Sequence, residues 1–341
     1  MLFGGAGTVT AQQENEVITR ALVYLVSNRD LVETKTGQIE LGGGRDVPRW
    51  GRCEVEFKPI PMVSEIAPKI PFYVQTETNE QRIALDASPE DFWQSLVAAV
   101  EGTSTRSVIL FIHGYSYDIE RGCHRAAEIQ RALDGEAIVL LFSWPSNGQA
   151  TDYMPDVADL EWSTPHLANL LLQLSQRVGA ANLHVLSHSL GARGIALALD
   201  HLRAEQLSAP LFGRWVLLAP DLDTQTFIDA LPRLAPAAES ITLYASSSDT
   251  PLKLSHQLSG SPRLGEAGEY LTVIDGIETI DVSTAGRYRF LGHEYFFFHP
   301  AVAADLLMLL REGVDAAARP GLRSQSRDGI TYWEVMGGNL P

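Results

Sequence analysis

The sequence has few basic residues, and this shortage excludes several classes of partner. Its 341 residues include 26 lysines and arginines against 42 aspartates and glutamates, which gives a formal net charge of -16. Lysine occurs only at Lys35, Lys58, Lys69 and Lys253. Because nucleic acids and anionic membranes are bound by basic surfaces, we expect neither to be a partner.

Cysteine is also scarce. Cys53 and Cys123 have no spacing, either to each other or to histidines, that is typical of a zinc site. We expect two buried free thiols, although a single disulfide is compatible with the sequence. No metal or other cofactor is expected.

Long apolar runs are missing as well. The longest candidate, residues 296–310, is interrupted by His299, Pro300 and Asp305, so no transmembrane segment is expected. Residues 1–13 lack the basic and apolar regions of a signal peptide. We therefore expect a cytoplasmic protein, or an exported form if a leader has been removed.

Apolar runs that favour strands alternate with helical patterns along most of the chain. Early strands are predicted at 21–27 and 54–60, joined by a Gly-rich polar loop at 42–45, with a helix at 88–100. Further strands are predicted at 107–112, 137–144, 183–186, 215–219, 241–245 and 278–282, and further helices at 119–133, 164–178, 192–207, 251–257 and 301–311. Such alternation predicts a buried, mostly parallel sheet with helices on both faces.

This pattern predicts one α/β domain with extensions. We expect residues 1–105 to form an N-terminal extension with the first strands of the sheet, and residues 106–312 to form the catalytic core. Residues 313–341 would be a C-terminal tail that packs on the core, with 330–335 as a possible edge strand. The oligomeric state is not predictable from the sequence.

The segment 183–191, LHVLSHSLG, has the pattern of a nucleophilic serine on a strand-to-helix turn. Such a turn requires small residues two positions before and after the serine, and Ser187 and Gly191 meet this requirement. The usual motif has glycine at the first of these positions, so Ser187 departs from it. We predict Ser189 as the nucleophile.

A serine hydroxyl needs an imidazole to take its proton and a carboxylate to orient that imidazole. In the chain order serine, acid, histidine, His293 lies between the last strand and the last helix, and is favoured over His256 and His299. Asp249 directly follows a predicted strand and is favoured as the acid, with Asp221 as the alternative. Asp249 precedes Thr250 and Pro251, so it could also be a simple helix N-cap.

Gly114 follows the strand 107–112 and predicts an oxyanion loop. The backbone N–H groups of Tyr115 and Leu190 are the predicted donors to the oxyanion. His113 is expected to orient this loop by hydrogen bonding without transferring protons.

With these residues assembled, the chain resembles the α/β-hydrolase superfamily. The resemblance is to a bacterial α/β-hydrolase family of formerly unknown function, whose members carry FIHGY, FSWPS and HSLG motifs. These correspond here to residues 111–115, 142–146 and 188–191, and the resemblance covers roughly residues 23–310. It implies a serine carboxylic ester hydrolase, esterase or lipase-like, with the triad Ser189, Asp249 and His293.

The expected substrate is a small-molecule or lipid-like ester with a short to medium acyl chain. Only a short helix fits between Asp221 and Ile241, so no large cap domain is expected. The predicted lid is the loop 147–162. The residues predicted to contact substrate are Gly114, His188, Trp144, Tyr153 and Tyr295, while the run 296–298 fits the core equally well.

Other activities remain compatible with the same triad. A thioesterase, an amidase or an acyltransferase would form the same acyl-enzyme and differ only in the leaving group or acceptor. A binding protein on a degenerate hydrolase scaffold would lack a triad residue, and all three positions are filled here.

Overall fold

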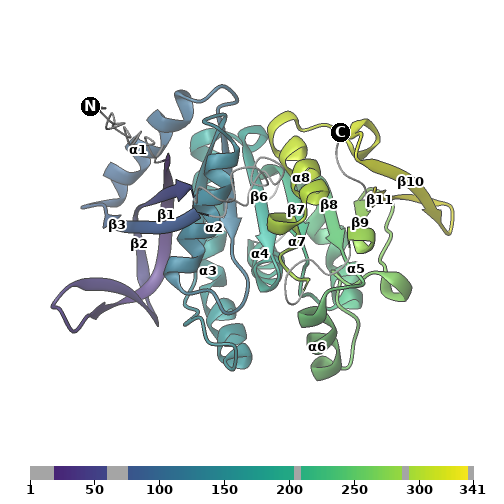
Figure 1. Cartoon of the computed structure of the whole chain (residues 1–341), viewed down its shortest axis with the longest axis horizontal. Helices are drawn as coiled ribbons and strands as arrows, with labels where there is room; N and C mark the ends of the chain where they lie inside the picture. The colour runs from purple at the N-terminus through teal and green to yellow at the C-terminus, as the bar shows by residue number, and fades with distance from the viewer. Residues whose placement is uncertain (1–18, 60–75, 203–208, 286–291, 337–341) are drawn as a thin grey trace, which may run out of the picture.

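The strands of the described part of the chain form one eleven-stranded sheet, in the order β10-β11-β9-β8-β7-β6-β4-β5-β1-β2-β3 (Figure 1). The computed structural model describes residues 19–59, 76–202, 209–285 and 292–336. The strands are β1 (Thr19–Glu33), β2 (Ile39–Pro59), β3 (Thr76–Leu85), β4 (Ser107–Ile112), β5 (Ala137–Ser143), β6 (Leu183–His188), β7 (Phe212–Leu218), β8 (Ala238–Ala245), β9 (Glu278–Asp281), β10 (Leu322–Arg327) and β11 (Ile330–Val335). Pairing is parallel from β1 through β5, β4, β6, β7 and β8 to β9 and β11, and antiparallel in β1–β2, β2–β3 and β10–β11.

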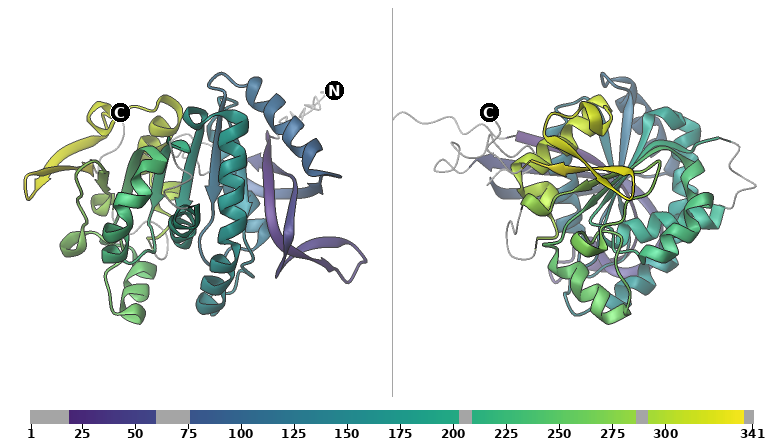
Figure 2. Two further views of the ribbon diagram at one scale, coloured as in Figure 1. Left: turned by 180° about the vertical axis from the view of Figure 1, so that it is seen from behind. Right: turned by 90° about the vertical axis from the view of Figure 1, so that its right-hand side faces the viewer.

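Helices cover both faces of this sheet (Figure 2). They are α1 (Pro89–Glu101), α2 (Ile119–Ala132), α3 (Tyr153–Val178), α4 (Leu190–Leu202), α5 (Thr224–Leu234), α6 (Thr250–Ser259), α7 (Tyr295–Phe298) and α8 (Pro300–Glu312). One core cluster contains side chains of α1, α3, α4 and α5, and the other contains side chains of α2, α7 and α8. The predicted fold class, a mostly parallel α/β sheet with helices on both faces, is confirmed.

Most predicted elements lie within a few residues of the observed ones. Ser88 is the N-cap of α1 and accepts a hydrogen bond from Asp91 N, as expected from its position before Pro89. The tail adds two strands to the sheet: β11, predicted as an edge strand, pairs with β9 on one side and with β10 on the other, so β10 is the edge strand. The predicted strand end at residue 60 and the predicted helix end at 203–207 lie outside the described residues.

The predicted loop at 42–45 is wrong, because these residues belong to β2. Arg45 pairs with Arg29 and Leu41 with Leu31 across register shifts in β1. Asp30 Oδ1 accepts a hydrogen bond from Gly44 N at 2.7 Å. A Cβ atom at Gly42 would lie 2.5 Å from the same oxygen, so the glycines make room for a carboxylate beside the strand and do not mark a loop.

Helix α3 begins at Tyr153 and not at residue 164, so the second half of the predicted lid loop is helical. Pro165 lies inside this helix, where it cannot donate to the carbonyl of Glu161. Thr164 Oγ1 donates to that carbonyl at 2.8 Å instead. This side-chain replacement explains why the helix continues through the proline.

Two further observations concern the exclusions made from composition. Cys53 and Cys123 are buried free thiols. Among the described helices, none is long and apolar enough to cross a membrane.

Candidate active site

Ser189 lies on a sharp turn between β6 and α4. Its φ is +53°, a left-handed conformation that is strained for a serine. The turn is held from two sides, because Ser189 N donates to Leu218 O at 3.0 Å and Asp221 N donates to Ser189 O at 3.2 Å. Strain of this kind persists only where surrounding contacts enforce it, and it is typical of functional turns.

The small residues around Ser189 are required by contacts with neighbouring strands. A Cβ atom on Gly191 would lie 2.5 Å from Ile112 O, which leaves room only for glycine. Ser187, which replaces the usual glycine, is buried, and its Oγ accepts a hydrogen bond from Trp215 Nε1 at 3.0 Å and donates to Val216 O at 3.3 Å. These hydrogen bonds satisfy the hydroxyl, so the departure from the usual motif is accommodated.

The loop after β4 lies directly against this turn. A Cβ atom on Gly114 would lie 2.8 Å from Ser189 Cβ and 3.0 Å from His188 Nδ1. Tyr115 follows Gly114, and Leu190 is the first residue of α4, where N–H groups have no partner within the helix. Of the two residues whose N–H groups were predicted as oxyanion donors, Leu190 therefore lies on the turn itself and Tyr115 lies on the loop that packs against it.

Stacking and hydrogen bonds between His113 and Trp144 support the loop after β4. His113 stacks on Trp144 with ring centroids 4.9 Å apart, and Trp144 Nε1 donates to His113 O at 3.0 Å. His113 Nδ1 and Gly114 O are 2.8 Å apart. Burial, and then the charge of Arg29, lower the pKa of His113 to about 3, so this imidazole is neutral at physiological pH. Trp144 was predicted to contact substrate, but it is fully buried and supports the loop.

Arg29, which the sequence analysis did not single out, joins the loops after β4 and β5 to strand β2. Its fully buried guanidinium donates to Ser143 Oγ at 2.8 Å, Tyr117 O at 2.8 Å and Gly42 O at 3.1 Å, and also to Ser146 O. Burial lowers the pKa of Arg29 to about 10, so it stays charged at neutral pH. No sequence motif marks this residue, because its partners are mostly backbone carbonyls.

His293 and Asp249 form a hydrogen-bonded pair. His293 Nδ1 lies 2.7 Å from Asp249 Oδ2, while Asp249 Oδ1 accepts from Leu252 N at 3.0 Å as the N-cap of α6. Both interpretations of Asp249 from the sequence, a helix cap and a partner of histidine, therefore hold together. One carboxylate oxygen serves each role.

The electrostatics of this pair favour the imidazolium. Burial opposes protonation of His293, but the charge and hydrogen bond of Asp249 together with the charge of Asp221 raise its pKa above the ordinary value. Burial also raises the pKa of Asp249, which His293 partly offsets.

His188 directly precedes Ser189, at the end of β6, and its ring contacts the ring of His293. Its ring centroid lies 4.7 Å from that of His293. Burial, and then the charge of His293, lower the pKa of His188 well below its ordinary value, so it adds no charge beside the pair. It lines the pocket together with His293, and its predicted contact with substrate stays a prediction.

Asp221, the alternative acid, bonds elsewhere. Its Oδ1 accepts from Ser255 Oγ at 2.7 Å and pairs with Arg263 Nε at 3.3 Å, and its Oδ2 accepts from Tyr153 OH at 2.8 Å. The structure thus places Asp249, and not Asp221, on His293 Nδ1.

Glu294 is a second residue that the sequence analysis missed. It accepts hydrogen bonds from Tyr117 OH, from Arg121 at 3.1 Å and from Arg125 at 2.9 Å. Burial would raise its pKa, but Arg125 and Arg121 hold it well below the ordinary value, so it is ionised. One sequence signal pointed to such a carboxylate. Arg121 and Arg125 are four residues apart on a predicted helix, so their charges lie on one face and favour an acidic partner.

A pocket of about 370 Å³ opens beside His293. It is lined by the loop after β4, by Ala150 and by α6 and α7 residues, including Tyr115, Tyr117, Arg121, Pro251 and Phe298. Tyr153 lies next to it, edge-on to Tyr115 with ring centroids 5.4 Å apart. Tyr295 faces the core, where its hydroxyl donates to Tyr244 O at 2.9 Å and accepts from Ala219 N at 3.1 Å.

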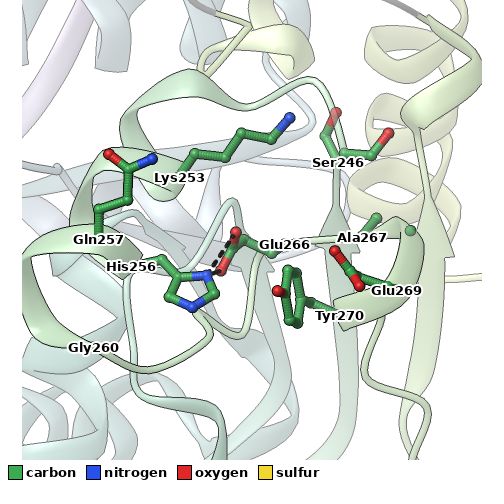
Figure 3. A pocket seen from close by; sticks show the side chains of 11 residues that line it. Ser246, Lys253, His256, Gln257, Gly260, Glu266, Ala267, Glu269 and Tyr270 are labelled. Atoms are coloured by element: carbon green, nitrogen blue, oxygen red, sulfur yellow. Dashed lines mark hydrogen bonds and ion pairs between the residues drawn. The ribbon is translucent and has the colours of Figure 1, made fainter.

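A larger pocket, of about 620 Å³, lies on another side of α6 (Figure 3). His256, which was weighed as a base, belongs to it and is paired with Glu266 at 2.9 Å. His299 begins α8. Within the described ranges, no group of three or more His, Cys, Asp or Glu side chains could hold a metal ion.

Comparison with known proteins gives a family match. The model of a family described as "Alpha/beta hydrolase of unknown function (DUF900)" matches residues 88–311. An uncharacterized protein of Nostoc sp. (strain PCC 7120 / SAG 25.82 / UTEX 2576), alr1448, is 36% identical over 61 residues, which are 18% of this chain and 16% of that protein. The phospholipase PlaB from Legionella pneumophila, solved in complex with thio-NAD, aligns over 67% of each chain at 11% identity and a TM-score of 0.36, a likeness too small to bear on activity.

Proposed function

Since the chain belongs to the family described as "Alpha/beta hydrolase of unknown function (DUF900)", we propose that it is a serine hydrolase that cleaves carboxylic esters through Ser189. The observation that carries this proposal is the hydrogen bond between His293 Nδ1 and Asp249 Oδ2, which are 2.7 Å apart. His293 lines a pocket whose wall also includes His188, the residue before the strained Ser189. A serine on a strained turn and an imidazole oriented by a carboxylate are two of the components that acyl transfer through a serine requires.

The proposed reaction runs through an acyl-enzyme. Ser189 Oγ attacks the ester carbonyl carbon while His293 Nε2 takes the hydroxyl proton. The negative charge formed on the carbonyl oxygen is stabilised by the N–H groups of Tyr115 and Leu190. His293 then gives its proton to the leaving alcohol as the ester C–O bond breaks.

Water completes the cycle by the same steps. It attacks the acyl carbon, gives its proton to His293, and the carboxylic acid leaves as Ser189 Oγ is reprotonated. Asp249 holds His293 Nδ1–H throughout and stabilises the imidazolium. Its second oxygen is fixed by the N–H of Leu252, so it is held in place before substrate binds.

The pocket supports a preference for short to medium acyl chains. Its volume of about 370 Å³ is at the lower end for ligand sites. The wall formed by Tyr115, Tyr117, Pro251 and Phe298 is suited to an apolar group.

A fluorophosphonate probe tests the proposal. We expect the folded wild type to be labelled and Ser189→Ala to remain unlabelled, with Ser187→Ala labelled as the control for a neighbouring serine. A panel of p-nitrophenyl esters and matched thioesters should give hydrolysis that declines beyond medium chains. Absence of labelling in the folded wild type would overturn the serine mechanism, and activity that rises steadily toward long chains would overturn the chain-length preference.

A further inference from the structure

The most exposed large apolar side chains of the described residues are concentrated on three elements. They are Ile39 at 61% and Val47 at 63% exposure on β2, Met154 at 70% on α3, and Leu254 at 55% and Leu258 at 70% on α6. Single exposed leucines are ordinary, but here the five most exposed side chains of this kind belong to only three elements.

Parts of these three elements lie beyond the carboxyl ends of the parallel strands, the end of the sheet that carries the candidate site. Ser27 pairs with Ser143, the last residue of β5, so the β1–β2 hairpin extends past the carboxyl end of β5. Helix α3 follows the carboxyl end of β5, and α6 follows that of β8. In Figure 1 the hairpin, the start of α3 and α6 all point to the lower side of the molecule.

On α6 the exposed leucines lie between two pockets. Pro251 of this helix lines the pocket beside His293, whereas Lys253, His256 and Gln257 line the larger pocket. With about 3.6 residues per turn, Leu254 and Leu258 form a stripe on the helix surface between those two sides. An apolar surface therefore adjoins both the candidate site and the larger pocket.

The larger pocket is lined by the ammonium of Lys253 and by two carboxylates, Glu269 and Glu266, the second of which is paired with His256. Lys253 and Gln257 reach into it from α6, and Glu269 and Tyr270 face them from the other wall (Figure 3). Among the described residues Lys253 has no ion-pair partner, and the Tyr270 side chain is 39% exposed. An ammonium suits a phosphate group, while a carboxylate beside an aromatic ring suits an organic cation.

We propose that this edge of the molecule docks on the surface of a zwitterionic phospholipid aggregate, with the hairpin, α3 and α6 side chains entering the acyl boundary. The pocket beside α6 takes one headgroup, its phosphate on Lys253 and its ammonium on Glu269 and Tyr270. The net charge of -16 opposes binding to anionic surfaces, which leaves zwitterionic lipid as the matching partner. This docking would supply the ester substrate from a lipid surface. Hydrolysis of the bound lipid rests on the proposed function.

Co-sedimentation with vesicles tests the docking. The wild type is expected to bind phosphatidylcholine vesicles, and Leu254→Ser/Leu258→Ser to reduce the vesicle partition coefficient by about tenfold or more, since two apolar side chains leave the boundary. The matched control is Leu22→Ser/Leu197→Ser, which removes two other exposed leucines, at 47% and 36% exposure, and should bind like the wild type. Thermal unfolding confirms that both double variants are folded.

Further arms separate the alternatives. Ser189→Ala should bind vesicles like the wild type, so a failure of fluorophosphonate labelling and a failure of vesicle binding are distinguishable. Lys253→Ala should weaken vesicle binding and abolish the thermal shift given by soluble phosphocholine. Three outcomes would overturn the proposal. The wild type does not bind phosphatidylcholine vesicles, it binds phosphatidylglycerol vesicles more tightly, or it forms a dimer that Leu254→Ser/Leu258→Ser dissociates.

Discussion

At the scale of single residues, Asp221 places a buried negative charge close to the His293–Asp249 pair without bonding to either. The charged and titratable groups that act on His293 are Asp249 from α6, Asp221 from the loop after β7, His188 from β6 and its own neighbour Glu294. Asp221 raises the pKa of both members of the pair. Its effect on the proposed reaction is therefore electrostatic.

Asp221→Asn should move the acidic limb of the kcat/KM profile to lower pH. The proposed base works when neutral, so the rate falls as pH drops through the pKa of His293, which lies above its ordinary value of about 6.5. Removing a negative charge lowers that pKa, and the neutral form then persists to lower pH. Ester hydrolysis followed across pH measures the shift. An unchanged limb, with Asp229→Asn as the surface control, would show that His293 does not sense this carboxylate.

Which aspartate meets His293 could not be decided from the sequence. Asp221 and Asp249 follow neighbouring parallel strands, so both lie at the same edge of the sheet. Their roles differ because Tyr153, Ser255 and Arg263 occupy the oxygens of Asp221. Those three residues are distant in the sequence, and their convergence comes from tertiary packing. The catalytic roles of Ser189, Asp249 and His293 themselves remain predictions.

At the scale of elements, helix α2 positions the loop that carries His293. Arg121 and Arg125 of this helix hold Glu294, the residue after His293, and Arg125 also pairs with Glu128 at 2.8 Å. The guanidinium of Arg125 lies 4.9 Å from the ring centroid of Phe297 in α7. The position of the proposed base is thus set from α2 as well as from α6.

Glu294→Gln should lower kcat for a soluble ester by about tenfold to a hundredfold with little change in KM, because a displacement of the base by about 1 Å has effects of this size. Glu128→Gln removes another carboxylate partner of Arg125 and serves as the matched control, with kcat expected near that of the wild type. Steady-state kinetics of both variants gives the comparison. Equal losses in kcat would mean that stability of α2, and not the position of His293, is responsible.

Periodicity predicted most elements, and it failed where one residue type had an unexpected local partner. The glycines at 42–44 were interpreted as a loop, yet they lie in a strand beside the Asp30 carboxylate. A helix was predicted to begin at residue 164, next to Pro165, yet α3 begins at Tyr153, and Thr164 supplies the hydrogen bond that the proline cannot make. In both cases a side-chain hydrogen bond lets a strand or helix continue through glycine or proline, which usually mark its end. Apolar periodicity does not show such hydrogen bonds.

At the scale of the whole molecule, a buried ion pair joins the C-terminal hairpin to the sheet. Arg319 Nη1 pairs with Asp305 of α8 at 3.1 Å and donates to Tyr244 OH of β8 at 3.0 Å. The side chains of Arg319 and Asp305 are 0% and 1% exposed. Removing Arg319 would leave the buried Asp305 carboxylate with the Tyr244 hydroxyl, at 2.6 Å, but without its ion-pair partner.

Arg319→Ala should lower the free energy of unfolding by about 3–5 kcal/mol. Arg323→Ala, which removes an exposed arginine paired with Glu334 on the same hairpin, should change it by no more than about 1 kcal/mol. Urea unfolding followed by circular dichroism measures both values. Similar values for the two variants would mean that the buried pair does not anchor the hairpin.

Composition and motif order were sufficient to predict the overall architecture. Alternating strands and helices specify a covered parallel sheet whatever the details of each turn. They do not specify how far the sheet extends, and β10 with β11 lengthens it beyond β9. The division into 1–105, 106–312 and 313–341 stays a prediction.

Each carboxylate oxygen of Asp249 makes a separate hydrogen bond, and this affects how natural or random variants of this chain would be interpreted. Asp249 caps the N-terminus of α6 with one oxygen and orients an imidazole with the other, so most replacements would reduce protein abundance and turnover together. Asparagine has nearly the same shape as aspartate and retains a capping oxygen while it removes the charge. In a mutational scan that scores abundance and activity separately, Asp249→Asn is therefore the variant that tells the two apart.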